Sequence, residues 1–320
     1  MPHGATTWSV LGGTGFVGSE IVRELRQRGQ TVSVIAAPRL LLRGARSAEN
    51  GRRHVMTEHR TVNELSGVLR GTDVLVNAAG VAAPDSGDTD ELFGANALLP
   101  GVVASAAVTA GVPRLIHLSS AAVLGPDARL HDRRDTKPFS PYSRSKALAE
   151  EILIDQGTSP GGLDLCVVRA SSVHGPGRST TLKLQRIARS SLSSVASPGE
   201  EPSPVSSVYG LAEFVVDLGL SSRPLPDIVV QPWEGSTTSS VLRLAGDGRE
   251  PRVLPRSLCA AVVSMARIVS RLTFGRLDGP VRRLELMWFG QIPENHSAVR
   301  PSDHLERALR PTVSVPGGRT

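Results

Sequence analysis

The sequence predicts an α/β fold, a doubly wound parallel sheet with helices on both faces, joined to a smaller C-terminal lobe. Through the first half of the 320 residues, short apolar segments of strand character alternate with segments of helical periodicity, which is the pattern of a parallel sheet. We expect strands at 8–11, 31–36, 74–78, 115–118 and 163–169, and a first helix over 17–29. Ligands bind such sheets beyond the carboxyl ends of the strands, so the residues that follow each strand are the candidates for function.

The second half of the chain has a different composition. Residues 189–207 are rich in Ser and Pro and lack an apolar period, which is typical either of a surface loop or of a lid that closes over substrate. Helical patterns return over 209–220 and 255–272, and a strand near 227–231 is expected to rejoin the main sheet. The expected division is a main α/β domain over 1–177 and a smaller lobe over 178–320.

The charge balance bears on the class of ligand. The chain carries a formal charge of +6, from 36 Lys and Arg against 30 Asp and Glu. Acidic residues are interspersed among the basic ones, so the sequence argues against a protein that binds nucleic acid. The balance is that of a solvated, arginine-rich surface, and an anionic small-molecule ligand is the alternative.

The cysteines and the apolar segments bear on the compartment. Cys166 and Cys259 lie in apolar segments without a metal-ligand neighbour, which favours a reducing compartment. Glycines interrupt the first hydrophobic run, and the stretch 257–274 contains Arg267 and Arg271. We therefore expect a cytoplasmic protein with no leader peptide and no membrane span.

A glycine-rich turn gives the first chemical signal. Gly12, Gly15 and Gly18 lie between the first expected strand and the first expected helix. Glycine at this spacing permits a tight turn, close approach of the backbone to a pyrophosphate, and close packing of the helix on the strand. The N–H groups that open the helix can then bind the phosphates, so the sequence predicts a Rossmann-type dinucleotide site.

Tyr142 and Lys146 give the second signal, because a spacing of four places them on one face of a helix. A phenol with a pKa of about 10 exchanges protons poorly at neutral pH. A neighbouring ammonium favours the phenolate and lowers that pKa toward the working range. Ser119 and Ser120 follow the expected strand 115–118, where a hydroxyl group can hydrogen-bond a reacting oxygen.

Together these residues resemble the short-chain dehydrogenase/reductase superfamily, and specifically its extended, NAD-dependent epimerase/dehydratase branch, over about residues 7–180. Asp73, Asn96 and the segments 77–80, 119–125 and 169–177 extend the resemblance. It implies that Ser120, Tyr142 and Lys146 are catalytic and that Lys146 also bonds the nicotinamide ribose. Leu124 and His174 stand where the family usually has tyrosine, and Ser172 stands where asparagine is common.

The resemblance and the glycine turn also imply the contacts of each ligand. The residues expected to contact the dinucleotide are Gly12, Thr14, Gly15, Phe16, Val17, Gly18, Arg39, Asn77, Ala78, Ala79, Tyr142, Lys146, Ala170, Ser171 and Val173. The residues expected to contact the substrate are Val81, Ser120, Ala121, Ser172, His174 and Arg186.

The second expected strand bears on the choice of cofactor. No carboxylate follows it, although an NAD enzyme tends to place Asp or Glu there to bond the ribose 2′-hydroxyl. Arg39, Arg43 and Arg46 follow instead, and arginine can pair with a 2′-phosphate. NADP is therefore favoured over NAD. The histidines lack zinc-type spacing, so no metal site is expected.

The C-terminal pattern over 255–272 and 282–291 is similar to that of bacterial nucleotide-sugar 4-reductases and 4-epimerases. The leading hypothesis is an NAD(P)-dependent ketoreductase of a nucleotide-linked or otherwise activated sugar, with Tyr142 as proton donor. The alternatives are a 4-epimerase that retains NAD, a steroid- or flavonoid-type alcohol dehydrogenase, and a non-catalytic dinucleotide-binding protein. We also expect a homodimer through the apolar helical segments 96–110 and 142–156.

Overall fold

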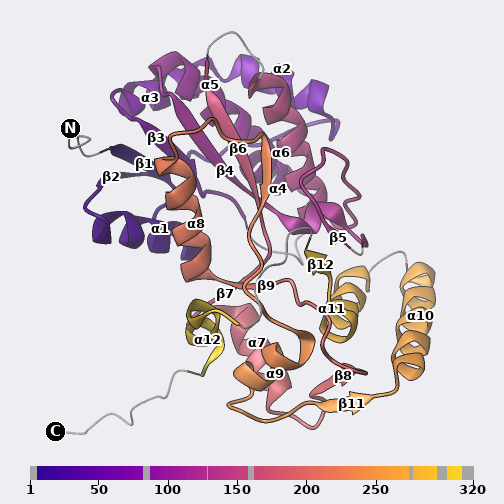
Figure 1. Cartoon of the computed structure of the whole chain (residues 1–320). Coiled ribbons are helices and arrows are strands. Elements are labelled where there is room, and N and C mark those ends of the chain that lie inside the picture. The colour runs from indigo at the N-terminus through magenta and orange to yellow at the C-terminus, as the bar shows by residue number, and fades with distance from the viewer. Residues whose placement is uncertain are drawn as a thin grey trace, which may run out of the picture. The chain divides into compact units, whose positions relative to one another are not determined.

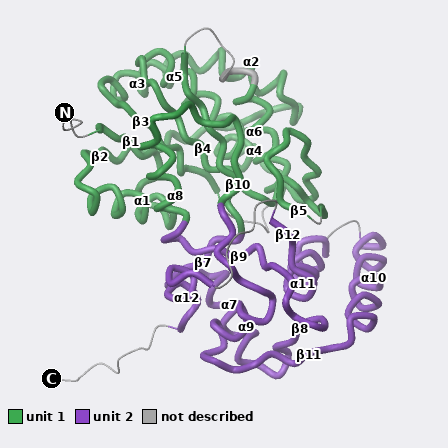
Figure 2. Tube along the Cα trace, viewed as in Figure 1, with its two compact units in different colours: residues 1–171, 211–231 green, residues 172–210, 232–320 purple. Residues whose placement is uncertain are grey.

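The computed structural model describes residues 6–81, 87–127, 129–157, 162–273, 277–293 and 301–311 (Figure 1). The chain forms two compact units, residues 1–171 with 211–231, and residues 172–210 with 232–320 (Figure 2).

The first unit contains the main sheet and its helices. Its elements are β1 (Thr7–Leu11), α1 (Phe16–Gln27), β2 (Thr31–Ile35), α2 (Ala48–Thr57), α3 (His59–Leu69), β3 (Val74–Asn77), α4 (Asp90–Phe93), the π-helix η1 (Gly94–Leu98), α5 (Leu99–Ala110), β4 (Arg114–Ser120), the 3₁₀ helix η2 (Ala121–Leu124), β5 (Arg129–Leu130), α6 (Pro141–Gly157), β6 (Asp164–Ala170), α8 (Val208–Leu220) and β10 (Ile228–Val230).

The six-stranded sheet has the order β10-β6-β4-β3-β1-β2, and every neighbouring pair is parallel. This confirms the predicted doubly wound α/β fold. The chain passes from β1 outward to β2 and then returns to β3 on the other side of β1. Because the strand order reverses there, a crevice is expected beyond the carboxyl ends of β1 and β3, at Leu11 and Asn77.

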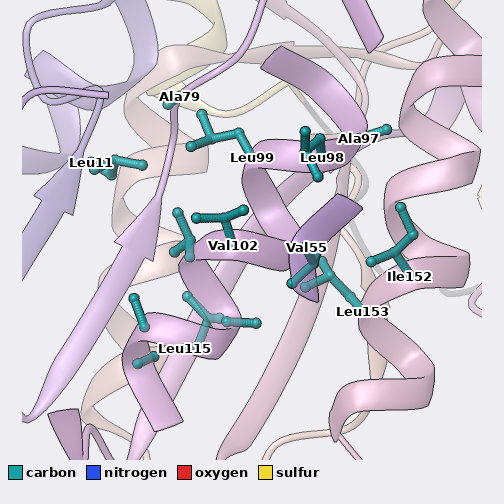
Figure 3. Close-up of a cluster of buried hydrophobic side chains, with 14 of the residues drawn as sticks. Leu11, Val55, Ala79, Ala97, Leu98, Leu99, Val102, Leu115, Ile152 and Leu153 are labelled. Carbon is teal, nitrogen blue, oxygen red and sulfur yellow. The ribbon is translucent and has the colours of Figure 1, made fainter. Parts of the chain in front are cut away.

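Helices α2, α3, α5 and α6 cover one face of this sheet, with α5 in contact with both α3 and α6. Figure 3 shows part of this buried cluster, including Leu11, Val102 and Leu115. Leu11, Leu75 and Leu115 project from neighbouring strands into this core and are at most 1% exposed. Gly51 of α2 brings that helix close to α6, since a Cβ there would lie 2.4 Å from Cδ1 of Ile152. The apolar residues of α5 and α6 are thus covered by the chain's own helices.

Helix α5 makes up most of 96–110, one of the two segments predicted to form a dimer. Within it, Leu99, Val102 and Val103 are at most 1% exposed, whereas Val108 is 41% exposed. The same run of helix, Asp90–Ala110, is the one described segment long and apolar enough to cross a membrane, with a mean hydropathy of 1.6. However, 78% of its apolar window is buried inside the chain, as in a core helix.

The opposite face of the sheet is covered by α1 and α8. Trp8 of β1 is fully buried, and its ring fills the place where a Cβ of Gly219 in α8 would otherwise lie. Arg114, at the start of β4, binds Asp164 at 2.7 Å and also donates to carbonyl oxygens at the C-terminal end of α8. These contacts join α8 and β10 to the main sheet.

The second unit contains β7 (Ser172–His174), α7 (Ser179–Ala188), β8 (Ser194–Ala196), β9 (Val205–Ser207), α9 (Thr238–Ala245), β11 (Arg252–Leu254), α10 (Arg256–Leu272), α11 (Asp278–Phe289), β12 (Ile292–Pro293) and α12 (Asp303–Leu309). Strand β7 pairs with β9, and β8 pairs with β11, in two short parallel ladders.

The structure gives the course of the second half of the chain in more detail than the expected division at 177/178. The chain leaves the first unit at 172, returns over 211–231 and leaves again. The strand expected near 227–231 is β10, which pairs with β6 as predicted. The segment 189–207, predicted to be a surface loop or a lid, contains two short strands, β8 and β9, each paired in a ladder.

Candidate dinucleotide site and catalytic residues

The turn between β1 and α1 leaves no space for side chains. Gly12 has φ +78°, and a Cβ on it would lie 2.7 Å from the backbone nitrogen of Ala79. A Cβ on Gly18 would lie 2.2 Å from the carbonyl oxygen of Gly12. Glycine at these two positions therefore allows helix α1 to begin directly against β1 and beside the loop that follows β3.

The N-terminus of α1 is open to a ligand. Its N-cap residue, Gly15, has no side chain to accept from the first N–H groups, and no acidic residue lies in the first turn. Thr14 and Gly15 are exposed, and Phe16 and Val17 are partly exposed. Free N–H groups and the helix dipole together favour an anion at this position, and a pyrophosphate fits it.

The end of β3 forms the other wall of the crevice. Ala78 donates its N–H to the carbonyl of Leu11 at 3.0 Å, which holds the β3 loop against β1. Asn77 is 1% exposed and accepts from the N–H of Ala79 at 3.2 Å. The Nδ2 group of Asn77 has no hydrogen-bond partner among the described residues. A buried amide donor of this kind is normally paired, so it fits a ligand acceptor at the crevice.

The arginines that follow β2 differ in their surroundings. Arg46 pairs with Asp88 at 3.1 Å and Asp90 at 2.9 Å, and its guanidinium lies 4.5 Å from the ring centroid of Phe93. Arg46 is therefore a structural residue. Arg39 is exposed and makes no ion pair with any residue in the described part of the chain.

The two serines at the end of β4 have different roles. Ser119 is buried and donates to Oε1 of Glu150 at 2.5 Å. Ser120 is partly exposed, and its hydroxyl accepts from the N–H of Ala122 at 3.2 Å as it caps η2. The hydroxyl hydrogen of Ser120 can therefore be donated to a ligand, and Ala121 follows it at the same partly exposed edge.

Tyr142 and Lys146 lie in the first two turns of α6, which packs against β4. Tyr142 is partly exposed, whereas Lys146 is only 6% exposed. The Nζ of Lys146 donates to the carbonyl of Leu118 in β4 at 2.9 Å. Burial lowers the pKa of Lys146 to about 8, against a raising effect of Glu150.

The loop after β3 also lies next to the ammonium group of Lys146. A Cβ on Gly80 would lie 3.3 Å from the Nζ of Lys146 and 2.8 Å from Oδ1 of Asn96. Asn96 lies in the π-helix η1. Its Oδ1 accepts from the N–H of Val81 at 2.8 Å, and its Nδ2 donates to the carbonyl of Val81 at 3.1 Å and to Oγ of Ser145 at 3.0 Å. Val81 itself is 39% exposed, in keeping with the predicted contact with substrate.

A buried ion pair joins α6 to β6 near these residues, and the sequence did not predict it. Glu150 and Arg169 are 2% and 0% exposed, and Nη2 of Arg169 lies 2.7 Å from Oε2 of Glu150. Arg169 also donates to the carbonyls of His131 and Arg133 at 2.9 and 2.8 Å. Glu150 follows Lys146 by four residues, so the helix spacing was the available signal.

His117 lies on the same face of β4 as Ser119, directly opposite Asn77 in register. It is fully buried, and neither ring nitrogen has a partner among the described residues. Burial, together with the charge of Lys146, lowers the pKa of His117 well below its usual value. The ring is therefore neutral and does not exchange protons at physiological pH.

The structure divides the remaining predicted residues between the two units. Ala170 and Ser171 lie at the end of β6, and Ala170 is in register with Ser120 of β4. Ser172, Val173, His174 and Arg186 belong to the second unit. Ser172 and Arg186 are exposed, and Val173 is buried.

His174, which was predicted to contact substrate, is buried in the second unit. The ring is 5% exposed, and its nitrogens lie 3.1 Å from the hydroxyl oxygens of Ser172 and Thr181. Burial lowers the pKa of His174 to about 3, so it is a neutral structural residue of the second unit. The tyrosine-like position in the sequence gave no indication of this burial.

The structure also brings together Asp127, His131 and Asp135, although their sequence spacing predicts no metal site. Lys137 lies 2.8 Å from Asp127 and lowers the pKa of that carboxyl group. His131 lies 3.5 Å from Asp127. The ammonium of Lys137 balances part of the acidic charge of this group.

Comparisons with known proteins agree with this geometry. The model of the NAD dependent epimerase/dehydratase family matches residues 8–212. The sterol demethylase protein B of Methylococcus capsulatus is 28% identical over 53% of this chain and 52% of its own length. A ketoreductase of Stigmatella aurantiaca, which acts on a 4-hydroxy-2-methyl-3-oxo-4-farnesyl-3,4-dihydroquinoline-1-oxide, is 30% identical over 52% and 50%.

A probable dTDP-4,6-dihydroxy-2-methyloxan-3-one 4-ketoreductase of Streptomyces antibioticus is 28% identical over 46% of each chain. The matches thus span about half the length of these curated relatives. Among solved structures, the NDP-hexosamine 5,6-dehydratase TunA superposes with a TM-score of 0.59 at 17% identity, over 95% of this chain and 96% of its own. MoeE5 in complex with UDP-glucuronic acid and NAD gives 0.57 at 21%, over 77% and 84%. At these identities the two structures support the fold.

Proposed function

The chain belongs to the NAD dependent epimerase/dehydratase family, and from that premise we propose that it is an NAD(P)-dependent ketoreductase acting on a nucleotide-linked or otherwise activated keto-sugar. The observation that carries the proposal is the contact of α6 with the end of β4: Nζ of Lys146 donates to the carbonyl of Leu118 at 2.9 Å, two residues before Ser120, and Tyr142 lies one turn before Lys146. Strand β4 contributes Ser120, and α6 contributes Tyr142 and Lys146. A bound nicotinamide dinucleotide would supply the hydride for reduction.

The dinucleotide fits residues of the first unit. The side-chain-free turn at Gly12 and Gly18 leaves space for the pyrophosphate at the start of α1. The unpaired Nδ2 of Asn77 offers a further donor at the crevice. By family resemblance, Tyr142 and Lys146 would hold the nicotinamide ribose.

The chain's own residues would perform the proton chemistry. Tyr142 would donate its phenolic proton to the carbonyl oxygen as that oxygen becomes an alkoxide. Ser120 would hydrogen-bond the same oxygen, and a preorganised donor of this kind is typically worth a few kcal/mol. Lys146, with a pKa of about 8, is mostly protonated at pH 7, and its charge would lower the pKa of the phenol.

Two features support an anionic sugar nucleotide as substrate. The chain carries a net charge of +6, and Arg186 is exposed without an ion-pair partner among the described residues. One of the curated relatives is a probable 4-ketoreductase of a dTDP-linked sugar. We further propose NADP as the preferred cofactor, on the exposed Arg39 and the lack of a carboxylate directly after β2, and a cytoplasmic enzyme.

A second candidate is a dehydrogenase or ketoreductase of a sterol or prenylated ring. It is favoured by the sterol demethylase protein B and by the farnesyl-dihydroquinoline ketoreductase, which match at 28% and 30% identity. A third candidate, a nucleotide-sugar 4-epimerase, would use the same three residues but would retain its cofactor through each turnover.

One assay separates these candidates. The cofactor that co-purifies with the protein is identified by mass, and NADPH and NADH oxidation is then followed at 340 nm. The substrates are a dTDP-linked 4-keto-6-deoxysugar, a UDP-hexose and a 3-ketosteroid. Oxidation with the keto-sugar alone supports the proposal, and oxidation with the steroid alone replaces it with the second candidate. Stoichiometric bound NAD, with interconversion of UDP-hexoses and no net oxidation, would establish the epimerase.

A further inference from the structure

The second unit contains a pocket whose walls include no residue predicted to contact the dinucleotide or the substrate. Its volume is about 450 Å³, within the range of about 300–1,000 Å³ that is usual for small-molecule sites. It lies beside the β8–β11 ladder, away from the β7–β9 ladder that carries Ser172 (Figure 2). Its walls come from the C-terminal end of α7, the ladder and α11, and they include Ile187, Leu192, Arg252, Leu254, Met287 and Trp288. We call it the α7–α11 pocket.

The inside of the α7–α11 pocket is apolar. Leu284 and Met287 line it with hydrocarbon and thioether groups. The indole N–H of Trp288 donates to Oγ of Ser194 at 3.2 Å, and that hydroxyl group donates in turn to the carbonyl of Leu192 at 3.1 Å. Because these two polar groups already bond the chain itself, neither has a hydrogen left to donate to a ligand. A sugar or a nucleobase would lose hydrogen bonds with water in this space, whereas a hydrocarbon chain would not.

Exposed aliphatic side chains continue the apolar wall to the mouth of the pocket. Leu192 is 74% exposed and Ile187 is 39% exposed. Single exposed aliphatic residues are common on protein surfaces and need no explanation. These two line the same pocket, so a hydrocarbon chain bound in it would remove both of them from water.

Arginines give the mouth of the pocket a positive charge. Arg252 lines the pocket, Arg189 follows the last turn of α7, and Nη1 of Arg249 donates to the carbonyl of Arg189 at 3.1 Å. All three side chains are exposed, and none of them forms an ion pair with a residue that the structure describes. Glu250, which follows Arg249 in the sequence, lies 3.6 Å from Arg243 instead. An anion at the mouth would therefore meet cationic groups that no described carboxylate balances.

We propose that the α7–α11 pocket binds a small anionic amphiphile, with a single hydrocarbon chain inside the pocket and a carboxylate or phosphate group on the arginines at its mouth. The apolar walls favour the chain, and a guanidinium group can pair with either anion through two parallel N–H groups. A neutral lipid would leave the arginines without a partner. A nucleotide would place a polar base against walls that cannot hydrogen-bond it.

This site is separate from the proposed reaction. All of its wall residues belong to the second unit, whereas Ser120, Tyr142, Lys146 and the glycine turn belong to the first. Binding of the amphiphile is therefore expected to be independent of NADPH. Failure of the proposed reaction would leave this inference standing, because binding and turnover are measured separately.

Isothermal titration calorimetry of the full chain tests the class of ligand. The probes are decanoate, decyl phosphate, decanol and inorganic phosphate, with the amphiphiles kept below the concentrations at which they form micelles. We expect one equivalent of decanoate or decyl phosphate to bind at least tenfold more tightly than decanol or inorganic phosphate. Saturation with NADPH should change that affinity by less than twofold, and the tighter of the two anionic probes identifies the head group. The proposal is overturned if neither anionic probe binds, if decanol or inorganic phosphate binds as tightly, or if NADPH competes.

Two pairs of variants locate the bound probe. Arg252→Glu reverses a charge at the mouth and should weaken both anionic probes at least tenfold, whereas Arg271→Glu on α10 should change either affinity by less than twofold. Leu192→Asp should also weaken binding at least tenfold, whereas Leu182→Asp, on α7 and outside the pocket, should not. All four side chains are exposed, so we expect each variant to fold. Equal affinities of the four variants would place the probe elsewhere and overturn the proposal.

Trp288 reports directly on the occupancy of the pocket. Its ring lines the pocket, whereas Trp8 is fully buried in the first unit. Decyl phosphate should therefore change the tryptophan emission of the wild type. Trp288→Phe should lose this change while it still binds the probe in the calorimeter. An emission change that persists in Trp288→Phe contradicts the assignment of the probe to this pocket.

Discussion

Lys146 is a buried ammonium that folding does not favour. Its pKa is lowered from 10.5 to about 8 by burial, which corresponds to a cost of about 3 kcal/mol at neutral pH. Its position between the carbonyl of Leu118 and the Gly80 loop places the charge beside the proposed reacting centre. The cost is therefore in keeping with a functional residue, because active sites are where such shifts are found.

Because burying Lys146 costs free energy, we expect a variant without this charge to be more stable than the wild type. Lys146→Met removes the buried charge but leaves the carbonyl of Leu118 without its donor, so we expect a net gain of about 1–2 kcal/mol at pH 7. Between pH 8 and 10.5 the unfolded wild-type chain binds a proton that the native state does not, so wild-type stability rises with pH.

Urea unfolding at pH 7 and pH 10.5 checks both points. The difference between Lys146→Met and wild type should shrink toward zero or reverse at the higher pH. The variant should also be inactive at either pH. A gain that does not change with pH would contradict the pKa assigned to this lysine.

Arg39 is the residue on which the proposed preference for NADP depends. If it pairs with a 2′-phosphate, Arg39→Ala should weaken NADPH binding at least tenfold and change NADH binding by less than twofold. Fluorescence titration measures both, with the exposed Arg60→Ala on α3 as control. Equal affinities of the wild type for NADPH and NADH would show that Arg39 does not bind the 2′-phosphate.

Residue roles were predictable where the signal is local. The spacing of Tyr142 and Lys146 and the glycines of the turn each follow from a few neighbouring residues. The Glu150–Arg169 pair joins α6 to β6 across 19 residues, so its contact appears only in the folded chain. The surroundings of His174 were likewise not predictable, because a position in a family motif does not reveal that both ring nitrogens lie next to hydroxyl groups.

At the scale of elements, the contact between α1 and β1 depends on Gly18. A Cβ there would lie 2.2 Å from the carbonyl oxygen of Gly12, so Gly18→Ala must move the start of the helix away from the crevice. We expect cofactor affinity to fall at least a hundredfold.

Gly67→Ala provides the matched control. Gly67 is in α3, and a Cβ there would meet nothing within 4 Å. This control should keep full affinity and gain about 0.5–1 kcal/mol of stability. Titration of NADPH fluorescence measures the affinities, and binding by Gly18→Ala within threefold of wild type would contradict the close packing.

The Glu150–Arg169 pair acts between elements, since it joins α6, β6 and, through Ser119, the end of β4. Removing one partner of a buried ion pair costs about 3–5 kcal/mol because the other charge is left uncompensated. Glu150→Gln and Arg169→Gln should each destabilise by about that amount. The double variant should lose at least about 2 kcal/mol less than the sum of the two. Additive losses in chemical denaturation would rule out direct coupling.

For the whole molecule, the sheet was predictable because each strand and helix has a strong local period. The order of its strands follows from right-handed crossovers between parallel strands. The division into units was not predictable by position along the chain. Its cause is tertiary: Arg114 and Gly219 hold α8 to the main sheet, and β10 then pairs with β6. Likewise, the Ser/Pro composition of 189–207 hides two short strands whose partners are distant in sequence.

We propose that this chain reduces a ketone with Tyr142 as the proton donor, and one measurement tests this role most directly. Wild type and Tyr142→Phe are mixed with NADPH and the keto-substrate that responds in the cofactor screen, and absorbance at 340 nm is followed. Cofactor affinity is measured in parallel. The variant lacks only the phenolic hydroxyl, so we expect its turnover to fall at least a hundredfold while NADPH binding changes by less than threefold. Turnover of Tyr142→Phe within tenfold of wild type would contradict the claim.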